Sequence, residues 1–424
     1  MNKYIFYIIF LLLLNSCNVN DNKIDPEICL IELGGTLGDF ESAPYAEALR
    51  QLKFNLGAEN VLIVNVCYVP VLEITGETKT KPTQAGIRES RRLGIPPDIL
   101  VVRCSQELTN DNIKKLSNMC QIPQEKIFMN QDLESIYQVP LHFNKKNLFG
   151  SINSQLKIIG EKNKLFTHHF WNHWLEMTYK LQNGTPHPIA IVGKYTQFTD
   201  SYLTLIHAIK HAASQLNIMP KLIWIDADQL LNNQDETWQL LKSSRAIIIP
   251  GGFGIRGTEG MILAANYART NNIPCLGICL GFQIMVIEFA RNILNLDNAN
   301  SIEFDHNCDH PVLSIINIKQ IDLGGTMRLG LQEVTLEKDS LAYQIYNKIS
   351  IWERHRHRYE VNPKYLGNRE FRNCFSGFDQ TGQRMEIFEL KDHLFYLGCQ
   401  FHAEYLTRPN KPHPIFLNWL SKIE

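Results

Sequence analysis

One cysteine of this sequence lies where it could act as a nucleophile. Cys279 stands between Gly277 and Gly281, where the apolar run Cys275–Ile278 gives way to a helix-like run, Phe282–Arg291. A strand, a tight turn and a helix in this order form a nucleophile elbow. The turn needs neighbours without bulk, and a helix N-terminus favours a thiolate over a thiol. We therefore predict an activated thiol, although a lone buried cysteine is usually an inert core residue.

A base for this thiol, and a group to orient the base, follow near the C-terminus. In the run QFHAE, His402 and Glu404 are two residues apart, so in an extended segment their side chains point to the same side. Glu404 can then orient His402, which is the arrangement that a nucleophilic cysteine needs. Upstream, Pro250–Gly254 (PGGFG) offers backbone N–H groups to an oxyanion. Each feature alone has an ordinary structural explanation, but together they predict a Cys–His–Glu triad.

Alternating strand-like and helix-like runs predict an α/β fold that positions these residues. In the first half, we expect strands buried in a parallel sheet at Ile28–Leu33, Asn60–Val66, Ile99–Arg103 and Ile127–Met129, with helices at Tyr45–Leu56, Ala85–Leu93 and Asp111–Cys120. A second series of strands is expected at Ile189–Val192, Lys221–Ile225, Ala246–Pro250 and Cys275–Ile278. The predicted domains are 28–150 and 187–424, and residues 151–186 form a linker with a helix around Phe166–Leu181.

Composition narrows the class of protein. With 44% apolar and 20% charged residues, the 424-residue chain can bury a sizeable core. A formal net charge of −1 argues against a non-specific nucleic-acid binder. The 10 cysteines include no CxxC pair, which argues against a structural zinc site and for a reduced, cytoplasmic protein.

Residues 1–27 suggest a different compartment. Lys3 precedes an apolar run, Tyr4–Leu14, and then Asn15–Cys17, which together have the layout of a bacterial lipoprotein signal. The run is too short for a stable membrane span. We expect an aberrant N-terminus on a cytoplasmic protein, with an exported lipoprotein as the alternative.

Longer segments point to one family. Ile249–Met261 (IPGGFGIRGTEGM), Asn271–Gln283 (NNIPCLGICLGFQ), Asp322–Gly330 (DLGGTMRLG) and Glu353–Asn362 (ERHRHRYEVN) resemble the glutaminase domain of CTP synthases, a class I glutamine amidotransferase domain. Glu32–Ser42 (ELGGTLGDFES) and Gly76–Gln84 (GETKTKPTQ) resemble the family's synthetase domain. The resemblance covers the chain from about residue 28 to its end. It implies a Rossmann-like, P-loop-type synthetase domain at 28–150 and an amidotransferase domain at 187–424.

The resemblance also implies a reaction and a set of sites. CTP synthases aminate UTP to CTP in pyrimidine nucleotide biosynthesis, using ATP, Mg²⁺ and ammonia from glutamine, with CTP as feedback inhibitor. The implied glutamine-binding residues are Gly252, Leu280, Gly281, Phe282, Gln283, Glu303 and Arg358. An arginine suits the α-carboxylate of glutamine, and Glu303 suits its α-ammonium. GTP is the implied activator, through a loop around residues 256–260, and a homotetramer is the implied assembly.

The resemblance places the nucleotide sites in the first half. Glu32 matches a magnesium ligand, as suits a carboxylate. The implied UTP and CTP residues are Asp39, Phe40, Glu41, Lys79, Thr80, Lys81, Pro82, Thr83, Gln84 and Lys115. The implied ATP residues are Gln131, Asp132 and Leu133, and the family usually has lysine where this chain has Gln131.

One family feature is missing from these residues. CTP synthases open with a strand and a glycine-rich phosphate loop, and Met1–Phe6 resembles the start of that strand, but Tyr7–Glu27 contains no glycine. We therefore expect a truncated synthetase domain that makes little or no CTP on its own, with weak glutamine hydrolysis and an incompletely covered sheet. An artefact in the predicted start of the gene would explain the same sequence.

Two other classes of function stay open. The chain could be a non-catalytic regulatory or assembly paralogue that keeps nucleotide contacts and oligomer surfaces. Retention of Cys279, His402 and Glu404 favours an enzyme instead. An exported peptidase would require lipidated Cys17.

Overall fold

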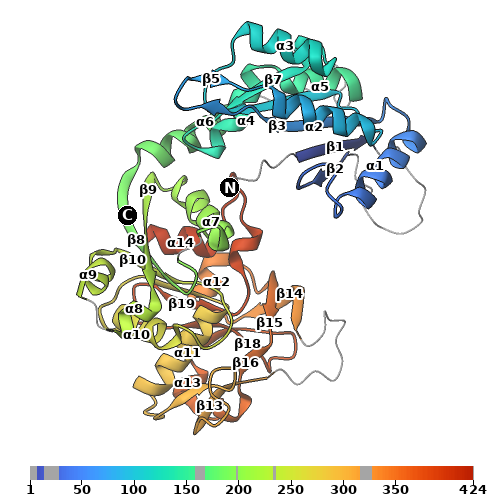
Figure 1. Ribbon diagram of the computed structural model, residues 1–424. Coiled ribbons are helices and arrows are strands. Elements are labelled where there is room, and N and C mark those ends of the chain that lie inside the picture. Colours follow the sequence, from blue (N-terminus) through green and yellow to red (C-terminus); the bar gives the residue numbers. More distant parts are fainter. Residues whose placement is uncertain are drawn as a thin grey trace. The chain divides into compact units, whose positions relative to one another are not determined.

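The computed structural model describes residues 7–13, 28–157, 168–196, 199–232, 235–315 and 327–423 (Figure 1). Most of the signal-like segment, residues 158–167 of the expected linker and most of Asp322–Gly330 lie outside the described residues. The chain divides into two compact units, Met1–Leu175 and Glu176–Glu424. A search of the described ranges finds no helix of the length and apolar character needed to cross a membrane.

The first unit is built on a five-stranded sheet with the order β2-β1-β3-β6-β7. Its strands are β1 (Tyr7–Leu13), β2 (Ile28–Leu33), β3 (Val61–Tyr68), β6 (Ile99–Cys104) and β7 (Ile127–Gln131), and β4 (Val71–Leu72) pairs with β5 (Glu77–Thr78) beside it. β3, β6 and β7 are parallel, as expected. β2 is an exception: it lies at the edge, runs antiparallel to β1 and is alternately exposed and half-buried, so the prediction of a buried parallel strand there was wrong.

Helices cover both faces of this sheet. They are α1 (Ala43–Leu56), α2 (Lys81–Arg92), α3 (Asn110–Cys120), α4 (Val139–Lys145) and α5 (Leu148–Leu156), with short 3-10 turns at Gln124–Lys126 and Ile136–Gln138. Successive residues of a strand face opposite sides. Leu100 therefore packs in a cluster with Leu116 of α3, whereas Val101 packs in a cluster with Leu148 of α5. These two clusters give the parallel half of the sheet a core on each side.

The second unit contains a nine-stranded mixed sheet with the order β15-β14-β17-β18-β19-β11-β10-β8-β9. In chain order its strands are β8 (Thr185–Gly193), β9 (Ile218–Asp226), β10 (Ala246–Ile249), β11 (Cys275–Ile278), β14 (Arg328–Leu336), β15 (Ser350–His357), β17 (Phe375–Phe378), β18 (Met385–Glu389) and β19 (Tyr396–Cys399). β9, β8, β10, β11 and β19 are parallel neighbours, so their carboxyl ends share one edge of the sheet. A separate three-stranded sheet contains β12 (Ala299–Ser301), β13 (His310–Ile315) and β16 (Tyr359–Val361).

Two hydrophobic clusters fill the faces of the large sheet. One contains Met261 and Phe282, from α10 and α11, and the other contains Leu205 and Trp419, from α7 and α14. The helices from this part of the chain are α6 (His168–Asn183), α7 (Leu203–Ala213), α8 (Ala227–Leu231), α9 (Asp235–Ser243), α10 (Thr258–Thr270), α11 (Leu280–Asn292), α12 (Leu341–Tyr346), α13 (Arg369–Arg372) and α14 (Pro414–Ser421), with 3-10 turns at Thr199–Tyr202, Pro363–Tyr365 and Ala403–Leu406. The packing leaves the loops at the carboxyl edge of β8, β10, β11 and β19 to form a site.

Candidate active site

The turn between β11 and α11 has the form of a nucleophile elbow. Cys279 is its single residue and adopts φ 52° and ψ −97°, a strained backbone for a non-glycine residue. A side chain on Gly281 would overlap the carbonyl oxygen of Ile249, and one on Gly277 would meet Met285 and the backbone of Gly281. Glycine on both sides therefore lets α11 pack tightly against β10 and β11.

The sulfur of Cys279 contacts two polar groups. Its Sγ lies 3.7 Å from the carbonyl oxygen of Arg356, which can accept the thiol proton. On another side, Nε2 of Gln400 lies 3.8 Å from the sulfur and can donate to it. The residue is only 3% exposed, so both contacts occur in a nearly dry environment.

His402 and Glu404 are in contact, but Ala403–Leu406 forms a 3-10 turn, so the extended segment assumed for this stretch was wrong. Nδ1 of His402 lies 2.7 Å from Oε1 of Glu404, and because a carboxylate only accepts, Nδ1 is the donor. Nε2 of His402 is buried without a hydrogen-bond partner among the described residues. Burial lowers the pKa of His402, but the charges of Cys279 and Glu404 and the hydrogen bond to Glu404 outweigh burial and raise it. The ring of Tyr405 stacks on the imidazole, with 4.7 Å between centroids.

The glycine-rich loop after β10 lies against the cysteine and the histidine. A Cβ placed on Gly251 would be 3.0 Å from Cε1 of His402 and 3.6 Å from Cβ of Cys279. A Cβ placed on Gly252 would be 3.1 Å from Cδ2 of Leu280, the first residue of α11. The first N–H groups of a helix have no acceptor within the helix. The backbone at Gly252 and Leu280 can therefore donate to a negative oxygen formed next to Cys279.

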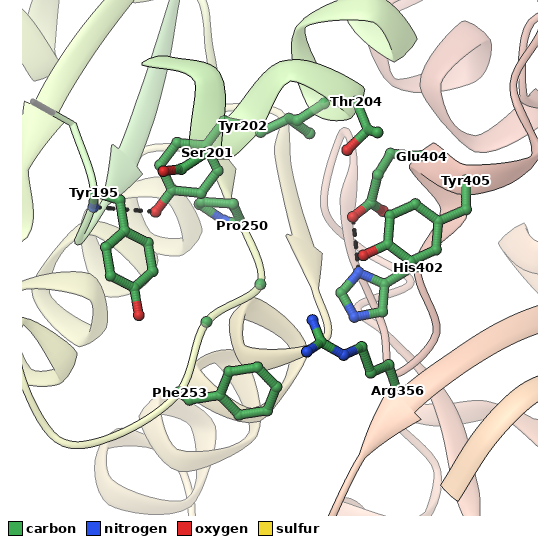
Figure 2. Close-up of a pocket in the computed structure, with 13 residues that line it drawn as sticks. Tyr195, Ser201, Tyr202, Thr204, Pro250, Phe253, Arg356, His402, Glu404 and Tyr405 are labelled. Atoms are coloured by element: carbon green, nitrogen blue, oxygen red, sulfur yellow. Dashed lines mark hydrogen bonds and ion pairs between the residues drawn. The ribbon is translucent and has the colours of Figure 1, made fainter. Parts of the chain in front are cut away.

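A pocket of about 360 Å³ opens beside these groups (Figure 2). It is lined by Tyr195, Ser201, Tyr202, Thr204, Leu205, Pro250, Gly251, Gly252, Phe253, Arg356, His402, Glu404 and Tyr405. In Figure 2 the guanidinium of Arg356 lies between Phe253 and His402, and its Cζ is 5.4 Å from the Phe253 ring centroid. The pocket thus combines aromatic walls, one cation and the imidazole.

The expected glutamine residues occupy different surroundings. Gly252 and residues 280–283 adjoin the cysteine, although the Phe282 side chain points into the core and leaves only its backbone for a ligand. Oε1 of Glu303 accepts from the N–H of Gly254 at 2.8 Å. Arg358 is exposed between β15 and β16 and does not line the pocket, whereas Arg356 does. Arg356 and Arg358 are two residues apart, so their side chains face the same side of the extended segment in and after β15. The sequence spacing could therefore have singled out Arg356 as well.

Lys194 is a site residue that sequence reasoning missed. It directly follows β8 and is 3% exposed, and its Nζ donates to the carbonyl oxygens of Phe253, at 3.2 Å, and Gly254. Burial lowers the pKa of Lys194 to about 8, and the charge of Glu303 opposes that shift. The glycine-rich loop is thus held by two side chains: Lys194 donates to its carbonyl oxygens, and Glu303 accepts from its N–H group.

Only some of the expected nucleotide residues come together. Glu32, Asp39 and Glu41 line one pocket of about 310 Å³ that is formed by the β2–α1 connection. Phe40 is 94% exposed. Three other sets of expected residues do not line that pocket: residues 79–84, before and in the first turn of α2, Lys115 on α3, and residues 131–133, at the end of β7 and just after it. In the described parts of the chain, no three His, Cys, Asp or Glu residues could hold a metal ion together.

Two family profiles match this chain. Residues 13–158 match the profile described as "CTP synthase N-terminus", and residues 197–421 match the profile of class I glutamine amidotransferases. CTP synthase from Sulfolobus acidocaldarius is 42% identical over 93% of this chain and 74% of its own length. CTP synthase from Dictyostelium discoideum is 41% identical over 95% of this chain and 75% of its own length.

A solved structure supports the assignment of the second unit. The glutaminase domain of Trypanosoma brucei CTPS, with bound acivicin, is 36% identical to this chain, with a TM-score of 0.52. The match covers 56% of this chain and 93% of that domain. Export as a lipoprotein finds no support in these comparisons, and β1 takes Tyr7–Leu13 of the signal-like run into a sheet.

Proposed function

This chain belongs to the CTP synthase family, and from that premise we propose that it hydrolyses glutamine to glutamate and ammonia, the reaction that in the family supplies ammonia for the ATP-dependent amination of UTP to CTP. The main support for this proposal is the geometry around Cys279, His402 and Glu404, in particular the 2.7 Å contact between Nδ1 of His402 and Oε1 of Glu404. It supports covalent hydrolysis of the side-chain amide. The same family membership makes a cytoplasmic location and a homo-oligomer the expected setting.

In the proposed mechanism, the thiolate of Cys279 attacks the carboxamide carbon of glutamine. The carbonyl oxygen becomes an oxyanion that accepts from the backbone N–H groups of Gly252 and Leu280. His402 gives its Nε2 proton to the departing nitrogen, so ammonia leaves and a thioester remains. A water molecule, deprotonated by His402, then attacks the thioester and releases glutamate and the thiolate. Glu404 keeps the imidazole oriented through both steps.

Recognition of glutamine is proposed for the residues around this centre. Glu303, which already accepts from Gly254, suits the α-ammonium group. Arg358 is the family's position for the α-carboxylate, and Arg356 offers a second guanidinium from the pocket wall. The remaining implied residues, 280–283, provide the first turn of α11 against which the amide would lie.

For the synthetase half, we propose that UTP and CTP bind near Asp39–Glu41, residues 79–84 and Lys115, and ATP near residues 131–133, as in the family. Mg²⁺, held partly by Glu32, would neutralise the phosphates when bound. Tyr7–Glu27 contains no glycine from which a phosphate loop could be built, so we assign no phosphorylation step to these residues alone. GTP remains the proposed activator, through the loop around residues 256–260.

Two assays on the purified chain test this proposal. We expect glutamate release from glutamine, lost by at least about 10²-fold in Glu404→Gln, because replacing the orienting carboxylate of a triad by an amide favours the wrong tautomer of the histidine. We also expect little CTP from UTP, ATP and either glutamine or ammonia. Glutamate release no faster than from Cys279→Ser would favour the non-catalytic paralogue. ATP-dependent CTP formation would instead show that the synthetase half is complete.

A further inference from the structure

Gln400 lies beside the nucleophile Cys279. It belongs neither to the triad nor to the expected glutamine-binding residues. It follows β19, is 1% exposed, and places Nε2 at 3.8 Å from Sγ of Cys279. Its backbone N–H donates to the carbonyl oxygen of Glu386 at 2.9 Å, which fixes the main chain without the side chain. The buried amide is therefore available for a task of its own.

The orientation of that amide follows from a chain of hydrogen bonds. Nε2 of Gln283 lies 3.0 Å from the carbonyl oxygen of Tyr359, and because a carbonyl only accepts, the Gln283 atom there must be the nitrogen. The same Nε2 lies 3.2 Å from the side chain of Gln400 and presents its second hydrogen, so the Gln400 atom there must be Oε1. The NH₂ group of Gln400 is then the one directed at the sulfur.

Besides the imidazole of His402, two polar groups act on the charge of the sulfur in opposite ways. The Arg356 carbonyl oxygen, 3.7 Å from Sγ, can accept from a thiol but repels a thiolate. In a site with little water, an N–H donor from Gln400, in addition to the His402 imidazolium, would offset that repulsion. We propose that Gln400 is a further catalytic residue whose amide N–H stabilises the Cys279 thiolate. Gln283 is the positioning residue that holds the Gln400 amide in the donating orientation. This inference rests on the proposed glutaminase function.

The test measures the thiolate directly, apart from turnover. The pH dependence of iodoacetamide alkylation is followed by mass spectrometry on the peptide that contains Cys279, in wild type and Gln400→Met, which keeps the side-chain length and removes the donor. We expect the alkylation midpoint to rise by about one pH unit or more, since a hydrogen bond to a charged group typically has that strength. Gln400→Glu, which adds a like charge, is expected to shift the midpoint further.

Two controls separate this role from a structural one. Gln344→Met, on the exposed side of α12, should leave the midpoint unchanged. Gln400→Asn keeps the amide but withdraws it from the sulfur, so it should shift the midpoint upward even if Gln400→Met does not fold. Folded Gln400→Met or Gln400→Asn protein with the wild-type midpoint would overturn the proposal. A shifted midpoint without glutamate release in the wild type would leave the thiolate role standing and refute the proposed function alone.

Discussion

At the scale of single residues, burial sets the charge of several groups around the site. Glu360 in β16 is an example: burial raises the pKa of its carboxyl to about 7, and Arg384, with Nε 3.0 Å from Oε2, offsets part of the effect. Its neighbour Glu386 differs because it accepts from Arg328 and from Nε2 of His355, at 2.9 Å for the histidine. The pKa values of the two carboxyls therefore shift in opposite directions: burial dominates at Glu360, whereas at Glu386 His355 and Arg328 outweigh burial and lower the pKa.

The raised pKa of Glu360 predicts a pH-dependent stability. Between about pH 4.5 and 7 the folded protein keeps a proton that the unfolded chain has lost, so the free energy of unfolding falls as pH rises through this window. Glu360→Gln removes this slope and should stabilise the protein above pH 7 by roughly 1 to 3 kcal/mol. Urea unfolding of both proteins from pH 4 to 8 measures the difference. A difference that does not vary with pH would contradict the assigned pKa.

The contact between His402 and Glu404 could be predicted from residue types and spacing, but the contacts that surround the sulfur could not. Glycines beside Cys279 and the spacing of His402 and Glu404 are visible in the sequence. The position of Gln400 depends on the parallel register in which Ile278 faces Cys399. A register between segments more than a hundred residues apart is a tertiary property, which no local pattern encodes.

At the scale of elements, apolar runs located the buried strands well. Cys275–Ile278 has the predicted bounds, and the predicted helix at Asp111–Cys120 is one residue longer in the structure. The antiparallel pairing of β1 with β2 and β3 was missed. An apolar run at a chain terminus indicates burial but not strand direction, so the sequence could not distinguish a signal segment from a strand.

The packing of α11 on β10 gives an element-scale prediction. A methyl group on Gly281 would overlap the carbonyl oxygen of Ile249, and a backbone atom in a central strand cannot move aside cheaply. Gly281→Ala should therefore lower the free energy of unfolding by roughly 3 kcal/mol or more. Gly367→Ala, where no atom lies within 4 Å of the added carbon, is the matched control and should be nearly neutral. Equal stability of the two variants would mean that α11 can shift away from the sheet.

At the scale of the whole molecule, the chain consists of two units whose cores are separate. Each hydrophobic cluster described for the large sheet draws all its buried members from Ala190 or Ile189 onward. The triad, the glycine-rich loop and the 360 Å³ pocket are also built from these residues. The acidic pocket at the β2–α1 connection belongs entirely to the first unit. We therefore expect the site around Cys279 to fold without side chains of the first unit.

This independence predicts that residues 176–424 fold alone. The solved Trypanosoma brucei domain, at 36% identity and a TM-score of 0.52, shows that a related segment exists as a separate structure. We expect the shortened chain to unfold cooperatively and to keep the alkylation midpoint of Cys279 within about 0.3 pH unit, a free-energy difference of roughly 0.4 kcal/mol. Circular dichroism melting and the alkylation assay on the full and shortened chains test this. If only the full chain were folded and reactive, contacts from the first unit would be needed to stabilise the elbow.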